Sequence, residues 1–172
     1  MKISHHIDFL VALLIVIATV ILAFVTYDRI IRINFFVLDL RFSHWLCIIG
    51  TIGIAVATPL FTLLKHKTPV NYKRIIRFHV FGNLIFFMLI TLHFFTQIAR
   101  PAANFPDIGS GLAMYLAMSL QILLGFTQRF RSQRTLYNKL FNPMTNKFVH
   151  AALVMVFYLV ILLHVLHGFR II

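Results

Sequence analysis

Five long apolar runs, separated by short segments that hold most of the charged residues, dominate the pattern of this chain. A helix needs roughly 20 apolar residues to cross the hydrocarbon core of a bilayer. The runs predict membrane-spanning helices at about residues 9–26, 45–64, 78–98, 112–126 and 148–167. The fourth run is short and contains Gln121, but without it the basic segments on its two sides would face opposite sides of the membrane. The pattern therefore predicts an all-α membrane protein with five transmembrane helices.

The segments between the runs suggest no further domain. The stretch YDRIIRINFFVLDLRFSH mixes bulky apolar residues with arginines, is too short and too charged for a sixth crossing, and is expected to lie in the membrane interface. The first run follows the N-terminus closely, as a signal peptide does, but no small-residue cleavage site precedes Tyr27 and Asp28. We expect a retained helix and a single transmembrane domain over residues 1–172 with no soluble domain.

The composition supports lipid as the main solvent. The chain is 60% hydrophobic and 12% charged, with a mean hydropathy of +0.92. Its formal net charge of +12 argues for contact with anionic lipid rather than nucleic acid, because the Lys and Arg residues lie in short segments between apolar runs. The N-terminus and the second and fourth connections between runs lie on one side of the membrane and carry 11 Lys and Arg. The segments on the other side carry 5. This bias predicts an integral cell membrane protein with a cytoplasmic N-terminus and an external C-terminus.

Four histidines repeat one spacing in the third and fifth runs. His79 and His93 are 14 residues apart, and so are His150 and His164. On a helix, that spacing falls within roughly 40° of four whole turns and separates the two levels by roughly 21 Å. The third and fifth helices run parallel because one returning helix separates them, so we expect His79 level with His150 and His93 level with His164. We call these four side chains the histidine ladder.

Two facing imidazoles at one depth are suited to axial ligation of a haem iron. A lone histidine in a membrane helix is more often a hydrogen-bonding contact between helices. Four at equal spacing are harder to explain by packing, because polar groups inside a bilayer are costly and usually functional. The ladder thus predicts two haem b groups, each with two histidine ligands.

The runs that carry the ladder resemble a known group of proteins. "RFHVFGNLIFFMLITLHFF" with "VHAALVMVFYLVILLHVLHG" is similar to the histidine pairs of ferric reductase and NADPH oxidase transmembrane domains, and to the haem-bearing helices of cytochrome b in quinol-cytochrome c reductases. The resemblance implies a haem-binding bundle formed by the last four helices. It implies that His79 and His150 bind the cytoplasmic-side haem, and that His93 and His164 bind the outer one.

The chain also departs from these proteins. Ferric reductases and NADPH oxidases usually continue into a flavin- and nicotinamide-binding domain, whereas this sequence shows no Gly-rich phosphate loop and ends at Ile172. Nor does it show the quinol-site signature of the larger cytochrome b. We therefore expect electrons to come from a quinol or from a partner oxidoreductase or cytochrome subunit.

Other residues near the ladder are candidates for contact with the cofactors. Arginine holds carboxylates by paired hydrogen bonds, so Arg77 and Arg74 at the level of His79, and Arg100 beyond His93, are candidates for haem propionates. Ordinary interfacial charge is the alternative for each. Asn83, one turn past His79, is a candidate hydrogen-bond donor in the same pocket. His167 is a candidate alternative outer ligand, or a propionate or quinone partner, although an interfacial residue without a role is the commoner case.

His44 stands beside Trp45 at the outer edge of the second run. It is a candidate for meeting a quinone headgroup and, if a quinol is the donor, for accepting its proton. An interfacial anchor pair is the commoner explanation of a histidine beside a tryptophan at this depth.

These observations predict a di-haem b-type cytochrome that relays electrons across the membrane, as a subunit of an oxidoreductase complex. Two further classes of function stay open. A transporter would use the histidines for metal ions or protons, but ligands at two levels roughly 20 Å apart do not form one metal site. A structural anchor subunit would explain the size of the chain, but not the repeated histidine spacing.

Overall fold

The computed structural model describes residues 2–101, 109–130 and 143–168. The chain divides into two compact units, Met1–Pro106 (unit 1) and Asp107–Ile172 (unit 2). Unit 1 contains α1 (Lys2–Tyr27), α2 (Phe42–Lys67) and α3 (Tyr72–Ile98), and unit 2 contains α4 (Gly109–Phe130) and α6 (Pro143–Gly168). Within the described residues, five helices are long and apolar enough to cross a membrane, which confirms the predicted all-α membrane fold.

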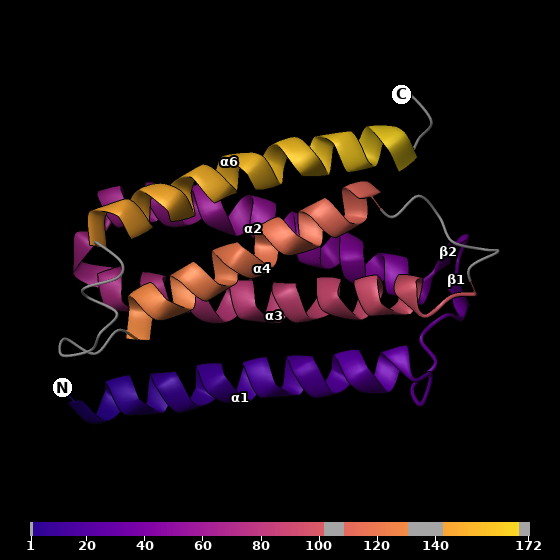
Figure 1. Ribbon diagram of the computed structural model, residues 1–172. Coiled ribbons are helices and arrows are strands. Elements are labelled where there is room, and N and C mark those ends of the chain that lie inside the picture. The colour runs from indigo at the N-terminus through magenta and orange to yellow at the C-terminus, as the bar shows by residue number, and fades with distance from the viewer. Residues whose placement is uncertain (1, 102–108, 131–142, 169–172) are drawn as a thin grey trace. The chain divides into compact units, whose positions relative to one another are not determined.

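In unit 1, α3 packs against both α1 and α2. Figure 1 shows α1 running beside α3 in the same direction, and α2 running the opposite way. A short hairpin precedes α2, in which β1 (Phe36–Val37) pairs antiparallel with β2 (Leu40–Arg41). The 3₁₀ turn η1 (Pro69–Asn71) joins α2 to α3. These connections place the end of α1, the start of α2 and the end of α3 at one end of the unit.

Two glycines allow α2 to pack closely against α3. A Cβ atom at Gly50 would lie 2.8 Å from the backbone oxygen of Phe86, and one at Gly53 would lie 2.4 Å from the Phe86 ring. Small residues at such positions let helices approach closely in a membrane, where packing replaces the hydrophobic effect as the driving force. The close approach of α2 to α3 thus depends on the lack of a side chain at Gly50 and Gly53.

Unit 2 consists of two helices that run antiparallel and side by side (Figure 1). Glycines of α4 again lie at the contact, because Gly111 and Gly125 both face histidines of α6. Met118 of α4 and Phe157 of α6 are almost completely buried. Near each end of the helix pair, a histidine of α6 lies against a glycine of α4.

Apolar side chains cover much of the outside of each helix. Leu14, Phe24 and Phe78 are more than 60% exposed, whereas the polar residues Ser43 and Thr91 are buried. A water-soluble protein has the opposite distribution, since exposed large apolar patches are rare there. The protein is therefore an integral membrane protein whose helices contact lipid. The orientation of its termini stays a prediction.

The helices extend beyond the predicted bounds at most ends. The third begins at Tyr72 rather than near residue 78, and the fifth at Pro143 rather than near residue 148. Helix can continue past the apolar run at such ends, because long basic side chains keep their charged groups in water while their stems cover apolar surface. The stretch expected to lie in the interface contains the β1–β2 hairpin, and the Trp45 indole donates a hydrogen bond to the Val37 oxygen at 3.0 Å.

Candidate functional site

His79 lies on the side of α3 that faces α2. Its ring stacks on the Phe61 ring of α2, with centroids 4.2 Å apart and an angle of 26° between the planes. Its Nδ1 atom lies 3.2 Å from the Asn83 amide nitrogen, one turn further along α3. Asn83 therefore contacts His79 directly, and its predicted role as a donor in a cofactor pocket stays a prediction.

The Asn83 amide is placed to determine which ring nitrogen of His79 carries the proton. The amide oxygen Oδ1 is buried and has no hydrogen-bond partner among the described residues. Exchanging the amide oxygen and nitrogen, which have nearly the same shape, lets Oδ1 accept the proton of His79 Nδ1. That arrangement satisfies the buried oxygen and places the lone pair of His79 on Nε2.

His93 faces the same helix near its other end. Its Nδ1 lies 3.1 Å from the backbone oxygen of Ser43, so the Nδ1 proton donates and Nε2 is left unprotonated. The His44 ring meets the His93 ring edge to face, with centroids 4.9 Å apart. His79 and His93 therefore share the α2-facing side of α3, as their spacing predicted.

The two histidines of α6 both contact α4. His164 Nδ1 lies 2.9 Å from the Ser110 hydroxyl, and its Cε1 atom would lie 3.6 Å from a Cβ at Gly111. At the other end, a Cβ at Gly125 would lie 3.3 Å from Cε1 of His150. Gly111 and Gly125 are 14 residues apart, so they repeat the spacing of the two histidines that they face.

The environment of His150 differs from that of the other three histidines. Its Nδ1 atom is buried without a hydrogen-bond partner among the described residues. The backbone carbonyl of Gln121 on α4 lies close enough to interact with the ring. A small rotation of the imidazole toward this carbonyl would give Nδ1 an acceptor.

The arrangement matches a recurring feature of histidine ligands. A metal-bound imidazole usually donates its second ring N–H to a carbonyl, hydroxyl or carboxylate, which fixes the ring and its tautomer. Asn83, Ser43 and Ser110 contact Nδ1 of His79, His93 and His164, respectively.

The predicted arginines do not share one role. Arg77 Nε donates to Asp8 Oδ2 of α1 at 2.9 Å, so part of its guanidinium is engaged in an ion pair. Arg74 is exposed. Arg100 lies just after α3 and lines a cavity with three other arginines, where burial and then the Arg41 charge lower the pKa of Arg100. His167 lies in α6, but its side chain is outside the described residues.

The ladder histidines belong to different units. His79 and His93 are in unit 1, whereas His150 and His164 are in unit 2. The structure supports the shared face within each helix, and the pairing of α3 with α6 stays a prediction. In the described part of the chain, no three His, Cys, Asp or Glu side chains group together as a metal site, and axial ligation of one haem needs only two.

Sequence reasoning missed several of these partners. Asp8 is the only acidic residue in α1, which was a readable signal for an ion pair. The equal spacing of Gly111 and Gly125 was also visible in the sequence. The Ser43 carbonyl carries no sequence signal, because every residue has a backbone oxygen.

No protein-family model, curated protein or solved structure matches this chain. The function of this chain is therefore inferred from its residues and their geometry.

Proposed function

We propose that this chain is a membrane-embedded di-haem b-type cytochrome that relays electrons between a quinol or partner protein and an acceptor. The observation that carries the proposal is the histidine ladder, with Nδ1 contacts at His79, His93 and His164. These contacts hold the imidazoles through Nδ1, as the second ring nitrogen of a metal-bound histidine usually is, and Nε2 would be the ligand atom. Packing alone gives no reason for this repeated orientation at equal spacing on two helices.

The residues fit a haem in three respects. Neutral imidazole is a common axial ligand, and the ladder offers two at each of two depths. Gly125 and Gly111 leave room beside the α6 histidines where larger residues would displace the rings. The buried, unpartnered Nδ1 of His150 and Oδ1 of Asn83 are polar atoms that cofactor binding would reorganise.

In this proposal, bound haem supplies a one-electron couple at iron, and the protein supplies position and environment. His79 with His150, and His93 with His164, would hold the two haems at separate depths. With two histidine ligands on each iron, the protein would leave no open position there for oxygen or substrate. The apolar helices around each pair keep water away and tune the potentials.

His44 is the candidate proton acceptor if the donor is a quinol. It lies against His93, and its Nδ1 is buried without a hydrogen-bond partner among the described residues. A quinol loses protons when it is oxidised, so a neutral imidazole beside the outer ligand is suited to receive one.

The test is haem quantification on purified wild-type protein and on single alanine variants of the four ladder histidines. We expect two haems per chain, and the loss of one from each ladder variant. The variants at His79 and His150 should lose the same component of the reduced-minus-oxidised spectrum, and those at His93 and His164 the other. His66→Ala is the control, because His66 is exposed at the end of α2.

Absence of haem from the wild-type protein, or retention of both haems in the ladder variants, would contradict the proposal. A metal or proton transporter and a bare structural anchor both predict no sharp b-type absorption bands on reduction. The same spectra therefore separate the three classes of function.

A further inference from the structure

Four arginines line one cavity of about 780 Å³ in unit 1, which we call the arginine pocket. They are Arg29, Arg32, Arg41 and Arg100, and they come from the end of α1, the following loop, β2 and the end of α3. Polar lining comes from Thr26, Asn34 and Thr96, and among the residues that the structure describes no carboxylate side chain lines the cavity. The described lining of the pocket therefore concentrates positive charge.

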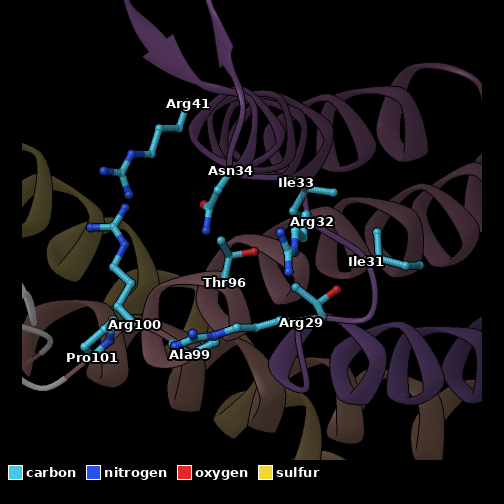
Figure 2. Close-up of a pocket in the computed structure, with 11 residues that line it drawn as sticks. Arg29, Ile31, Arg32, Ile33, Asn34, Arg41, Thr96, Ala99, Arg100 and Pro101 are labelled. Atoms are coloured by element: carbon cyan, nitrogen blue, oxygen red, sulfur yellow. The ribbon is translucent and has the colours of Figure 1, made fainter.

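Two of the guanidinium groups point toward each other. Figure 2 shows the side chains of Arg41 and Arg100 approaching from opposite sides of the cavity. Arg100 Nε is buried and has no hydrogen-bond partner among the described residues. Like charges that face each other repel, and an unpartnered buried donor costs free energy, so an anion between these groups would remove both penalties.

Arg29 fixes one wall of the arginine pocket. Arg29 donates to the Ala99 oxygen through its Nε at 3.1 Å and also through a terminal nitrogen, which ties the end of α1 to the end of α3. Arg29 itself has a φ of 60°, a left-handed conformation that is uncommon for residues other than glycine. A short, hydrogen-bonded connection therefore fixes one wall before any ligand arrives.

The pocket also lies where phosphate groups are abundant. It is at the ends of three membrane-spanning helices, Tyr27, Phe42 and Ile98, which is the level of lipid headgroups. Beside it, apolar side chains are strongly exposed, including Ile30 at 72% and Leu38 at 81%. Such side chains are stable when they insert among acyl chains, which brings the neighbouring arginines to the headgroup phosphates.

We propose that the arginine pocket binds a phosphate oxyanion, supplied either by the headgroup of an anionic phospholipid or by free phosphate. Guanidinium groups match phosphate by paired, charge-assisted hydrogen bonds, and Arg41 with Arg100 provides such donors from two sides. None of the four ladder histidines lines this pocket.

Trp45, the only tryptophan of the chain, provides a reporter. The Trp45 indole donates a hydrogen bond to the Val37 oxygen in the hairpin, and the second strand of that hairpin carries Arg41. Binding at Arg41 should therefore change the emission of Trp45. The full-length protein is placed in nanodiscs of phosphatidylcholine, a zwitterionic lipid, without detergent. Inorganic phosphate is then titrated in while chloride keeps the ionic strength constant. A parallel series replaces part of the phosphatidylcholine with phosphatidylglycerol.

We expect a saturable change in Trp45 emission in at least one series. A response to phosphate alone assigns free phosphate as the ligand source, whereas a response to phosphatidylglycerol alone assigns the lipid headgroup. Responses in both assign the shared phosphate group. No saturable response in either series would overturn the proposal.

Variants test the residues. Arg41→Gln with Arg100→Gln should raise the half-saturating concentration at least about tenfold, since two paired contacts are lost. Lys65→Gln with Lys67→Gln removes the same charge from exposed positions at the opposite end of α2 and should leave it unchanged. Equal weakening by both double variants would reduce the effect to net charge and overturn the proposal.

Two further readouts distinguish this site from its alternatives. Arg41→Lys with Arg100→Lys keeps the charge but loses the planar donors, so we expect weakening of several-fold even if the glutamine variant fails to fold. The lysine variant should also retain both haems. Loss of the outer haem with an unchanged phosphate response would assign Arg100 to a haem propionate instead, and would overturn the proposal.

Discussion

The two units present their histidines to neighbouring helices in different ways. On α3, a hydrogen bond with the Asn83 amide orients His79, and a hydrogen bond to the Ser43 carbonyl orients His93. On α6, both histidines lie against glycines of α4, with one hydroxyl contact at His164. The comparison shows two physical means of orienting an imidazole in a membrane, by hydrogen bonding and by close helix approach.

The difference also predicts where each unit is sensitive. In unit 1, glycines serve the packing of α2 on α3, away from the histidine contacts. In unit 2, glycines serve the histidines directly. Substitution of glycine should therefore change stability at Gly50 in unit 1, and cofactor binding at the tighter contact of Gly125 in unit 2.

Gly50→Ala should have the largest effect on folding. The new Cβ would lie 2.8 Å from a backbone oxygen of α3, which cannot move without moving the helix. Overpacking of this kind costs about 1–3 kcal/mol of unfolding free energy, measured here by reversible denaturation in mixed micelles. Gly111→Ala is the control, because its nearest contact is 3.6 Å, and an equal loss in the two variants would contradict the comparison.

Asn83→Ala should weaken binding of the haem proposed at His79 and His150, the inner haem, by about 10–100-fold, since loss of a partner that orients a metal-bound histidine has effects of that size. Haem titration of the apoprotein measures the affinity. Ser43→Ala is a sharp control, because His93 contacts the backbone oxygen of Ser43, which the substitution retains. A loss of outer haem in Ser43→Ala would show that the side chain, rather than the carbonyl, is important.

Gly125→Ala should shift the His150 ring by a few tenths of an ångström, because the added Cβ would lie 3.3 Å from Cε1. We expect a loss of inner-haem affinity of about two- to fivefold, which corresponds to less than about 1 kcal/mol. Gly111→Ala should leave the outer haem unaffected at 3.6 Å. Equal responses at the two haems would mean that glycine does not determine the ring position.

Asp8→Asn should have the smallest effect. Its ion pair with Arg77 is partly exposed on the arginine side, at 45%, and such pairs contribute about 0.2–1 kcal/mol. The same denaturation measurement detects the loss, and haem content should not change. If Arg77→Gln loses the inner haem while Asp8→Asn retains it, Arg77 holds a propionate in addition to Asp8.

Much of the fold was readable from the hydrophobic pattern. Long apolar runs must form helices in lipid, because the backbone has no other partner for its hydrogen-bonding groups there. The shared face of His79 and His93 followed from helical geometry, as did that of His150 and His164. The exact helix ends were not readable, because basic and aromatic residues at the interface are compatible with either helix or loop.

The amino-acid sequence by itself determined the solvent, the five helices and the equal histidine spacing. These depend on composition and on a local repeat, which no distant contact alters. Only the tertiary structure decided that Ser43 offers a carbonyl to His93, that Asp8 pairs with Arg77, and that Arg41 meets Arg100 in one pocket. Such contacts join residues far apart in the chain, so they arise only when packed helices and their connections bring those residues together.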